Sequence, residues 1–294
     1  MRIMYLVFGD TLRYHIEANL SIRTFQRQME QTDSISVLTN RPEYYRRAKV
    51  DVIPLDDERM KMWSGKHRYK FRIKIKAVEF MYQQHPGEDL LFVDCDTFLY
   101  GSLQVLKDRL AGGAGLMHQN EGHPSGMSGP ALKMWNTMKE RRVGDITIGE
   151  EHDLWNSGVI GIPTAKIRQV VNDWLLLCDE MLEHGVKAFN MEEYALSIAL
   201  FCHTTLKATD DLVGHYWGNK EVWEQMVSDL MCQAYMKDLT LEEELASLDM
   251  DLLCNIPVYV NRSSRYRQLC KLADKLFPVR GVKTVKNASS IATS

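Results

Sequence analysis

Short apolar runs alternate with longer stretches of helical periodicity through the first hundred residues of the chain. The runs predict strands and the stretches predict helices. Strands are expected at residues 3–8, 34–38, 50–55 and 90–93, and helices at residues 14–29 and 69–84. Because strands joined by helices in this order form βαβ units, the sequence predicts an α/β fold with a mainly parallel sheet flanked by helices.

The second half of the chain continues with helices and fewer strands. A further strand is expected at residues 156–162, and later helices follow Thr164, Asn190 and Lys220. Residues 118–130 are rich in Gly, Ser, His and Pro and have no apolar period, which is typical of a long loop. We predict a compact domain over residues 1–225 and a helical C-terminal extension over residues 226–294.

Charge is balanced over the whole chain but not along it. The 36 Lys and Arg residues face 39 Asp and Glu residues, which makes a generally cationic nucleic-acid binder an improbable class. From Val258 onward there are eight basic residues and the single acid Asp274. An amphipathic basic helix is expected at residues 263–277, and it is interpreted either as attachment to an anionic membrane surface or as an ordinary solvated helix.

Cysteine use and hydropathy indicate the compartment. The six cysteines have no Cys-x-x-Cys pair and no zinc-like spacing, so they are expected to be reduced and mostly buried. No apolar run approaches the roughly 18 residues of a membrane span, and residues 1–8 are too short for a signal peptide. We therefore expect a cytoplasmic protein, with peripheral contact to the inner face of a membrane if the basic tail binds lipid.

Two carboxylates one residue apart follow the buried run at residues 90–93. Asp94-Cys95-Asp96 is placed at the carboxyl end of a central strand, where open α/β sheets bind ligands. Like charges this close repel each other, and a divalent cation such as Mg²⁺ or Mn²⁺ relieves the repulsion. The spacing alone also occurs by chance in solvated strand ends, so the neighbouring motifs decide between the two interpretations.

Four motifs occur in an order that resembles a known family. Asp94-Cys95-Asp96 is followed by Asn156-Ser157-Gly158, by Glu192-Glu193 and by the segment from His215 to Lys220. Together they resemble the GT-A-fold nucleotide-sugar glycosyltransferases, and glycosyltransferase family 8 in particular, over residues 1–225. Glu192-Glu193 stands where that family commonly has Asp-Gln. The family's lysine is usually followed by Pro and Trp, whereas Lys220 is not.

The resemblance implies roles for individual residues. Asp94, Asp96 and His215 would hold Mn²⁺ or Mg²⁺, with Asp94 on the metal or on the donor's ribose. Lys220 would neutralise the departing diphosphate, and Asn156 would line the sugar pocket. A metal ion and the ammonium group of Lys220 at these places suit the chemistry, because negative charge develops on the β-phosphate as the nucleotide leaves.

Other candidate donor-binding residues lie upstream. Gly9, Asp10 and Tyr14 follow the first strand, where the family binds base and ribose, although a Tyr at this position is about as often part of the core. Three basic residues on the helix before the Asp-x-Asp strand alternate with apolar ones, and residues spaced by two cannot share one helical face. Of Lys70, Arg72 and Lys74, we favour Arg72 as the one that faces the nucleotide.

The acceptor step needs a further acid. Asp153, Glu192 and Glu193 are the candidates for base or nucleophile, and the sequence leaves open whether transfer inverts or retains the anomeric configuration. The predicted function is transfer of a sugar from a nucleotide-diphosphate donor, a UDP-sugar by resemblance, to a hydroxyl of a glycan or lipid-linked saccharide. The alternatives are a non-catalytic sugar-nucleotide or glycan-binding module and a haloacid-dehalogenase-type phosphatase.

Overall fold

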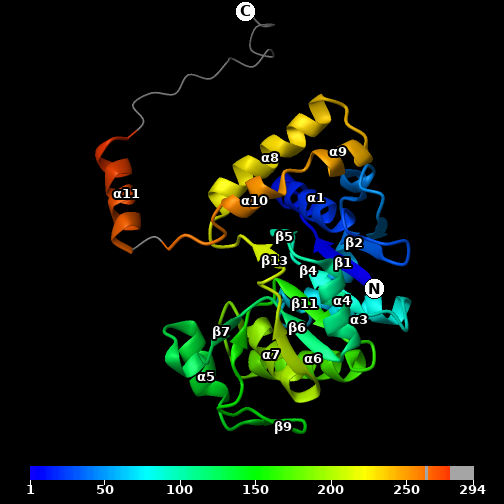
Figure 1. Ribbon diagram of the computed structural model, residues 1–294. Helices are drawn as coiled ribbons and strands as arrows, with labels where there is room; N and C mark the ends of the chain where they lie inside the picture. The colour runs from blue at the N-terminus through cyan, green and yellow to red at the C-terminus, as the bar shows by residue number, and fades with distance from the viewer. Residues whose placement is uncertain (262–263, 279–294) are drawn as a thin grey trace, which may run out of the picture. The chain divides into compact units, whose positions relative to one another are not determined.

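The computed structural model describes residues 1–261 and 264–278. The chain divides into two compact units, Met1–Val258 and Tyr259–Ser294. The first unit is built on a seven-stranded sheet in the order β12-β6-β11-β4-β1-β2-β3 (Figure 1). The strands of this sheet are β1 (Arg2–Val7), β2 (Ser34–Thr39), β3 (Asp51–Pro54), β4 (Leu90–Val93), β6 (Ala114–Met117), β11 (Val159–Ile162) and β12 (Thr205–Ala208).

The sheet is mixed but mainly parallel. Strand β1 pairs in parallel with β2 and β4, β2 with β3, and β12 with β6. Only β11 among these seven strands runs against its neighbours β4 and β6. The predicted α/β class with a mainly parallel sheet is therefore confirmed, and β11 places its first residue beside the last residue of β4.

Alternation along β1 gives each face of the sheet its own core. Ile3, Tyr5 and Val7 point to one face, where they pack with residues of α1 and α4, whereas Met4 packs on the opposite face with residues of α3, α6 and α7. The helices of the two layers are α1 (Leu12–Gln26) and α4 (Leu103–Ala111) on the first face, and α2 (Asp57–Trp63), α3 (Arg72–Gln84), α6 (Ile167–Glu183) and α7 (Met191–His203) on the other.

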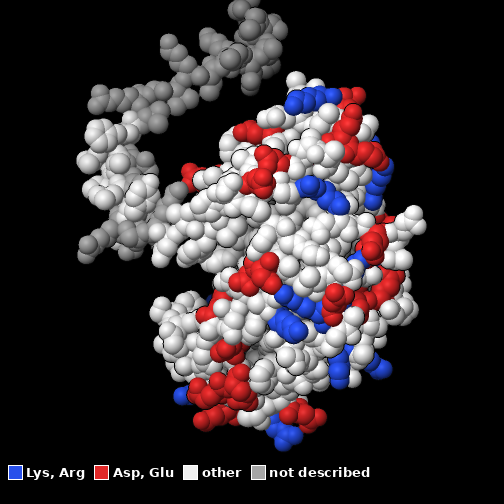
Figure 2. Space-filling view, viewed as in Figure 1, with Lys and Arg blue, Asp and Glu red and all other residues white. Residues whose placement is uncertain are grey.

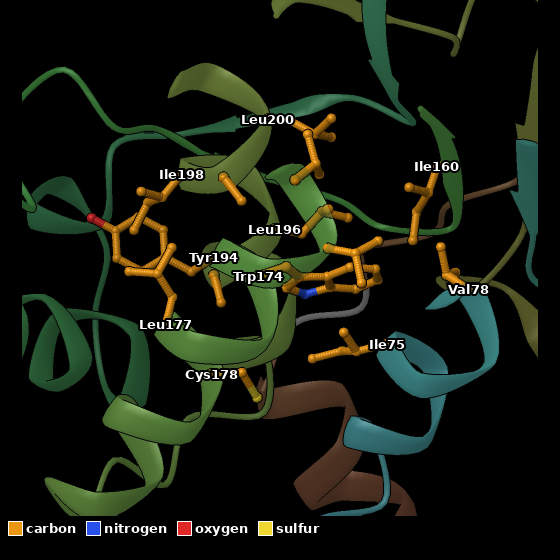
Figure 3. Close-up of a cluster of buried hydrophobic side chains, with 14 of the residues drawn as sticks. Ile75, Val78, Ile160, Trp174, Leu177, Cys178, Tyr194, Leu196, Ile198 and Leu200 are labelled. Carbon is orange, nitrogen blue, oxygen red and sulfur yellow. The ribbon is translucent and has the colours of Figure 1, made fainter. Parts of the chain in front are cut away.

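The core around Trp174 fixes the start of α7. Figure 3 shows this buried indole of α6 between Ile75 of α3 and Leu196 of α7. Its Nε1 atom donates a hydrogen bond to the backbone oxygen of Glu192, at 3.0 Å. A buried donor without a partner costs roughly 1–3 kcal/mol, so this bond ties the first turn of α7 to the core.

A two-stranded ribbon and a group of helices complete the first unit. Strand β5 (Thr97–Leu99) pairs with β13 (Val213–His215), and α8 (Lys220–Met236) lies beside α1 (Figure 1). The ring centroids of Tyr216 and Trp223 lie 4.3 Å apart, and those of Phe98 and Trp223 lie 4.8 Å apart, both in stacked arrangements. This aromatic stack anchors the chain between β13 and α8.

Shorter elements fill the connections. They are η1 (Pro42–Tyr45), β7 (Asn120–Gly122), η2 (Pro124–Gly126), α5 (Pro130–Met138), β8 (Arg142–Val143), β9 (Ile146–Thr147), β10 (Leu154–Trp155), α9 (Leu241–Ser247) and α10 (Met250–Asn255). Thr240 caps α9 in a capping box with Glu243. The predicted loop at 118–130 thus contains β7, which pairs with β10, and the helix α2 was not anticipated.

Helices α8, α9 and α10 belong to the same compact unit as residues 1–225, because Val227 and Leu253 are buried against Leu20 and Phe98. The second unit contains α11 (Ser264–Leu276), as the sequence predicted. The boundary at residues 225 and 226 remains a prediction. Within the described residues, no helix has the length and apolarity needed to cross a membrane.

The free cysteines are less buried than expected. Cys178 is buried and Cys95 is half-buried, but Cys202, Cys232 and Cys254 are exposed, so the prediction of mostly buried thiols is wrong for the described side chains.

Acidic and basic side chains are interspersed over the described surface seen in Figure 2.

Candidate active site

The Asp-x-Asp segment lies where three pieces of the chain meet. Asp94 follows the last residue of β4, and its backbone N–H donates to the carbonyl oxygen of Gly158 at 2.9 Å. Because β11 is antiparallel to β4, Asn156-Ser157-Gly158 reaches the carboxyl end of β4 just before β11 begins. Two of the four sequence motifs are therefore adjacent.

The β5–β13 ribbon brings the third motif to the same place. His215 is the partner of Thr97 in this ribbon, which sets its imidazole beside Asp96. The Nε2 atom of His215 lies 3.3 Å from Oδ1 of Asp96, and ligand atoms of Asp94, Asp96 and His215 all lie within 4.8 Å of one another. This distance is suitable for three ligands of a single cation.

Lys220 adds a positive charge from the first turn of α8. Its Nζ atom lies 2.8 Å from Oδ2 of Asp96 and 5.7 Å from the centre of the Tyr14 ring. Burial disfavours the charged carboxylate of Asp96, but His215 and Lys220 outweigh burial and hold its pKa below the usual value. Asp96 is therefore ionised and ready to bind a cation.

A second positive charge comes from α3. The Nζ atom of Lys74 lies 3.4 Å from Oδ1 of Asp94 and 3.9 Å from Oε2 of Glu192, and it donates to the hydroxyl of Ser157 at 3.1 Å. Burial lowers the pKa of this ammonium group, but Asp94 and Glu192 raise it above the ordinary lysine value. Lys74 is thus a buried, charged group between two acids.

Three further acids have raised pKa values. Burial, opposed by Lys74, raises the pKa of Glu192 to about 8 and also raises those of Glu193 and Asp94. The backbone N–H of Ser157 donates to Oε1 of Glu193 at 3.3 Å. Carboxyl groups with raised pKa values in a cavity are suited to proton transfer near neutral pH.

These groups line one cavity of about 500 Å³. Aromatic side chains from three segments stand beside the charged groups. The lining residues are Phe71, Lys74, Asp94, Asp96, Glu121, Asn156, Ser157, Phe189, Asn190, Glu192, Glu193, His215, Trp217 and Lys220. Residues separated by up to 149 positions in the chain therefore meet in one place.

The donor set fits a divalent cation. Two carboxylates and one imidazole are suitable ligands for Mn²⁺, and Mg²⁺ takes the carboxylate oxygens. Of the described residues, only Asp94, Asp96 and His215 form a cluster of at least three possible metal ligands. The three residues that the sequence singled out as ligands are thus brought together by the fold.

The prediction that Arg72 faces the nucleotide needs correction. Its guanidinium group donates to both carboxylate oxygens of Asp179, at 2.8 and 3.0 Å, and to the carbonyl oxygen of Trp63. Arg72 does not line the cavity, whereas Lys74 does. The basic residue of α3 that reaches the site is therefore Lys74, because α6 holds Arg72 through Asp179.

Other predicted residues lie outside the cavity lining. Asp153 accepts a hydrogen bond from Asn120 Nδ2 at 2.8 Å, and Asp10 pairs with Arg41. Gly9 follows β1 with a φ of +98°, a conformation that favours glycine. Of the residues expected at the base and ribose, Tyr14 contacts the site through Lys220.

Glu121 is a cavity residue that the sequence did not indicate. Burial raises the pKa of its carboxyl group, and Oε1 accepts a hydrogen bond from Asn156 Nδ2 at 3.3 Å. It lies on β7, whose pairing with β10 brings it to Asn156. A single acid in a segment without periodicity gives no sequence signal, so only the pairing of the strands identifies it.

The fold is similar to that of solved glycosyltransferases. Galactosyltransferase LgtC, solved with donor and acceptor sugar analogues, matches with a TM-score of 0.50 at 14% identity over 98% of each chain. The bifunctional glycosyltransferase WbbM matches with a TM-score of 0.49 at 12% identity, over 71% of this chain, which spans only 39% of WbbM. Mouse xyloside xylosyltransferase 1 matches with a TM-score of 0.46 at 14% identity, over 70% of this chain and 84% of that one.

No family model and no curated protein matches the sequence. The likeness to LgtC extends over nearly the whole of both chains. The chain therefore has the GT-A-type fold that its sequence motifs predicted.

Proposed function

We propose that the protein is a metal-dependent glycosyltransferase that moves a sugar from a nucleotide-diphosphate donor, a UDP-sugar, to a hydroxyl of a glycan or lipid-linked saccharide. The observation that carries the proposal is the meeting of Asp94, Asp96 and His215 with Lys220 in one cavity. The GT-A-type fold supports it, because the solved relative LgtC is a galactosyltransferase that binds donor and acceptor analogues.

The donor side of the cavity carries the charges that a diphosphate needs. Asp94, Asp96 and His215 would hold Mn²⁺ or Mg²⁺, and the cation would stabilise negative charge on the leaving phosphate. Lys220 lies 2.8 Å from Asp96, so its ammonium group is placed beside the same phosphate. The ring of Tyr14, next to Lys220, is available to stack on the nucleobase of the donor.

The acceptor side carries the acids. Glu192 and Glu193 line the cavity, and burial, opposed by Lys74, raises the pKa of each carboxyl group, which makes its carboxylate form a stronger base toward an acceptor hydroxyl. We propose that one of them serves as base or nucleophile. Asp153 is removed from this proposal because it lies outside the cavity lining. Lys74 holds Glu192 and Asp94 in place and assumes the donor-binding role first given to Arg72.

The test is donor binding measured with and without Mn²⁺. A ligand that binds only the folded protein raises its melting temperature, so a panel of nucleotide sugars identifies the donor by thermal shift. The expected result is a UDP-sugar shift that requires Mn²⁺, together with slow hydrolysis of that donor. Asp96→Asn should abolish the shift, and Asp145→Asn, a fully exposed acid, should preserve it.

Each alternative gives a different result. A glycan-binding module would bind saccharides without Mn²⁺ and would hydrolyse no donor. A phosphatase of the haloacid-dehalogenase type would cleave a generic phosphomonoester, and Asp94→Asn would abolish that cleavage. Absence of any Mn²⁺-dependent nucleotide-sugar binding would overturn the proposed function.

We also propose that α11 attaches the protein to an anionic membrane surface, where a lipid-linked acceptor would be found. Leu269, Leu272 and Leu276 are 63%, 51% and 64% exposed, and Lys271 and Lys275 lie between them in sequence. Basic residues near an anionic surface contribute about 1 kcal/mol each. Lys271→Glu with Lys275→Glu should reduce sedimentation with phosphatidylserine vesicles, and unchanged sedimentation would overturn this proposal.

A further inference from the structure

We propose that Asn156 is a positioning residue, which holds the imidazole of His215 with its hydrogen on Nδ1 and leaves Nε2 to bind the cation. The inference deepens the proposed function and rests on it. Asn156 touches the ligand side chain at 3.0 Å, from Oδ1 to Nδ1. Such outer partners of metal ligands fix the ring and set the affinity for the metal.

Two neighbours determine which way the Asn156 amide points. The backbone N–H of Gly158 can only donate, and it lies 3.0 Å from the Asn156 Oδ1 atom, which identifies that atom as the accepting carbonyl oxygen. The other end of the amide, Nδ2, donates to Oε1 of Glu121 at 3.3 Å. Both hydrogen bonds require the same orientation of the amide.

This orientation determines the hydrogen on the imidazole. Because Oδ1 of Asn156 carries no hydrogen, the Nδ1 atom of His215 has to supply one. As a metal ligand the imidazole is neutral and has a single ring hydrogen, so Nε2 then presents its lone pair. Nε2 is the ring nitrogen on the side of Asp96, 3.3 Å from its Oδ1 atom. The free lone pair therefore faces the other metal ligands.

Glu121 is the outer end of this chain of hydrogen bonds. Its carboxylate accepts a hydrogen bond from Nδ2 of Asn156, and hydrogen bonds in such chains polarise and strengthen one another. Both Asn156 and His215 are 6% exposed, so water offers little competition for the inner bond. Glu121 is half-buried, which makes it a site where substitution is expected to leave the core intact.

The first experiment measures Mn²⁺ affinity by calorimetry on the full chain in the presence of UDP. Asn156→Ala should weaken binding by about 10- to 100-fold, and Glu121→Ala by a smaller factor, on the order of threefold to tenfold. Asn136→Ala, on the exposed face of α5, is the matched control and should not change the affinity. Thermal unfolding of each variant checks that the fold is intact.

A rescue distinguishes positioning from mere packing. The double variant Asn156→Asp with Glu121→Gln reverses one hydrogen bond and keeps the other two. The new carboxylate at position 156 still accepts from the backbone N–H of Gly158 and from Nδ1 of His215, and the new amide at position 121 donates to that carboxylate. Mn²⁺ affinity should return to within about threefold of the wild-type value. A two-bond ¹H–¹⁵N spectrum of the Mg²⁺-saturated wild type should show hydrogen on Nδ1 of His215, and Asn156→Ala should lose this single tautomer.

The outcomes separate the two proposals. A wild-type protein that binds neither Mn²⁺ nor donor overturns the proposed function and this inference with it. A wild-type protein that binds both, while Asn156→Ala and Glu121→Ala bind Mn²⁺ within twofold of it, overturns the inference alone. If Asn156→Ala does not fold, Glu121→Ala and the tautomer of the wild-type imidazole decide the question.

Discussion

A Cβ atom on Gly158 would lie 2.3 Å from both Cε1 and Nδ1 of His215, closer than any two such atoms can approach. The imidazole is buried and held by Asn156, so it could give way only by leaving its place beside Asp96. Only glycine therefore allows the chain to enter β11 against the ring of His215.

Gly158→Ala should displace His215 and weaken Mn²⁺ binding by at least about tenfold. We also expect a loss of about 1–3 kcal/mol in the free energy of unfolding, which is usual for overpacking. The matched control is Gly126→Ala, because a Cβ atom there meets nothing within 4 Å. Equal Mn²⁺ affinity in the two variants, measured by calorimetry, would contradict the expectation.

Lys220→Met tests the charge that we propose to lie beside the diphosphate. Removal of this ammonium group should lower kcat for donor hydrolysis by about 10²- to 10³-fold, since it withdraws a charge from the leaving phosphate. It should also weaken UDP binding, and it should raise the pKa of Asp96 because the ammonium group beside that carboxylate is lost. Lys133→Met, an exposed lysine of α5, serves as the control. Unchanged kcat in Lys220→Met would remove Lys220 from the proposed mechanism.

The sequence was sufficient to predict the Asp-x-Asp strand end, because a buried apolar run followed by two acids is a local pattern. It was also sufficient to order the four motifs along the chain. The neighbouring sequence does not determine whether Arg72 or Lys74 faces the site. This choice depends on Asp179, which is 107 positions away and holds the Arg72 guanidinium group through two hydrogen bonds.

The cavity acids show the same limit. Glu192 and Glu193 were found from a motif at the start of α7, but Glu121 comes from β7, a three-residue strand inside a segment without periodicity. Its position depends on pairing with β10, more than thirty residues later. Pairing between short strands leaves almost no trace in hydrophobic pattern, so this part of the site requires coordinates.

Substitution of the two basic residues of α3 should separate their roles. Lys74→Met leaves Asp94 and Glu192 without their buried cation, and we expect a loss of about 3 kcal/mol in the free energy of unfolding. Arg72→Met removes a pair with the partly exposed Asp179 and should cost less than about 1 kcal/mol.

Chemical denaturation of both variants measures the difference in stability, and UDP-sugar binding measures the difference in function. Only Lys74→Met should weaken donor binding. The reverse order, in either stability or binding, would show that Arg72 and not Lys74 serves the site.

Glu192→Gln tests the raised pKa of a buried acid. In the folded protein the pKa of Glu192 is raised to about 8, whereas its ordinary value is 4.5. Between these pH values the folded state binds a proton that the unfolded state has released. Wild-type stability should therefore decrease as pH rises through this window, by at most about 1.4 kcal/mol per pH unit from this group.

The glutamine variant cannot ionise, so its stability should fall less steeply than that of the wild type between pH 5 and pH 8. Urea denaturation at several pH values gives both slopes. Glu180→Gln is the control, because this acid lies near the exposed end of α6 and outside the cavity. Parallel stability curves for wild type and Glu192→Gln would mean that Glu192 is ionised in the folded protein. In that case Lys74 would compensate its charge fully, and Glu192 would face the acceptor as a carboxylate of ordinary basicity.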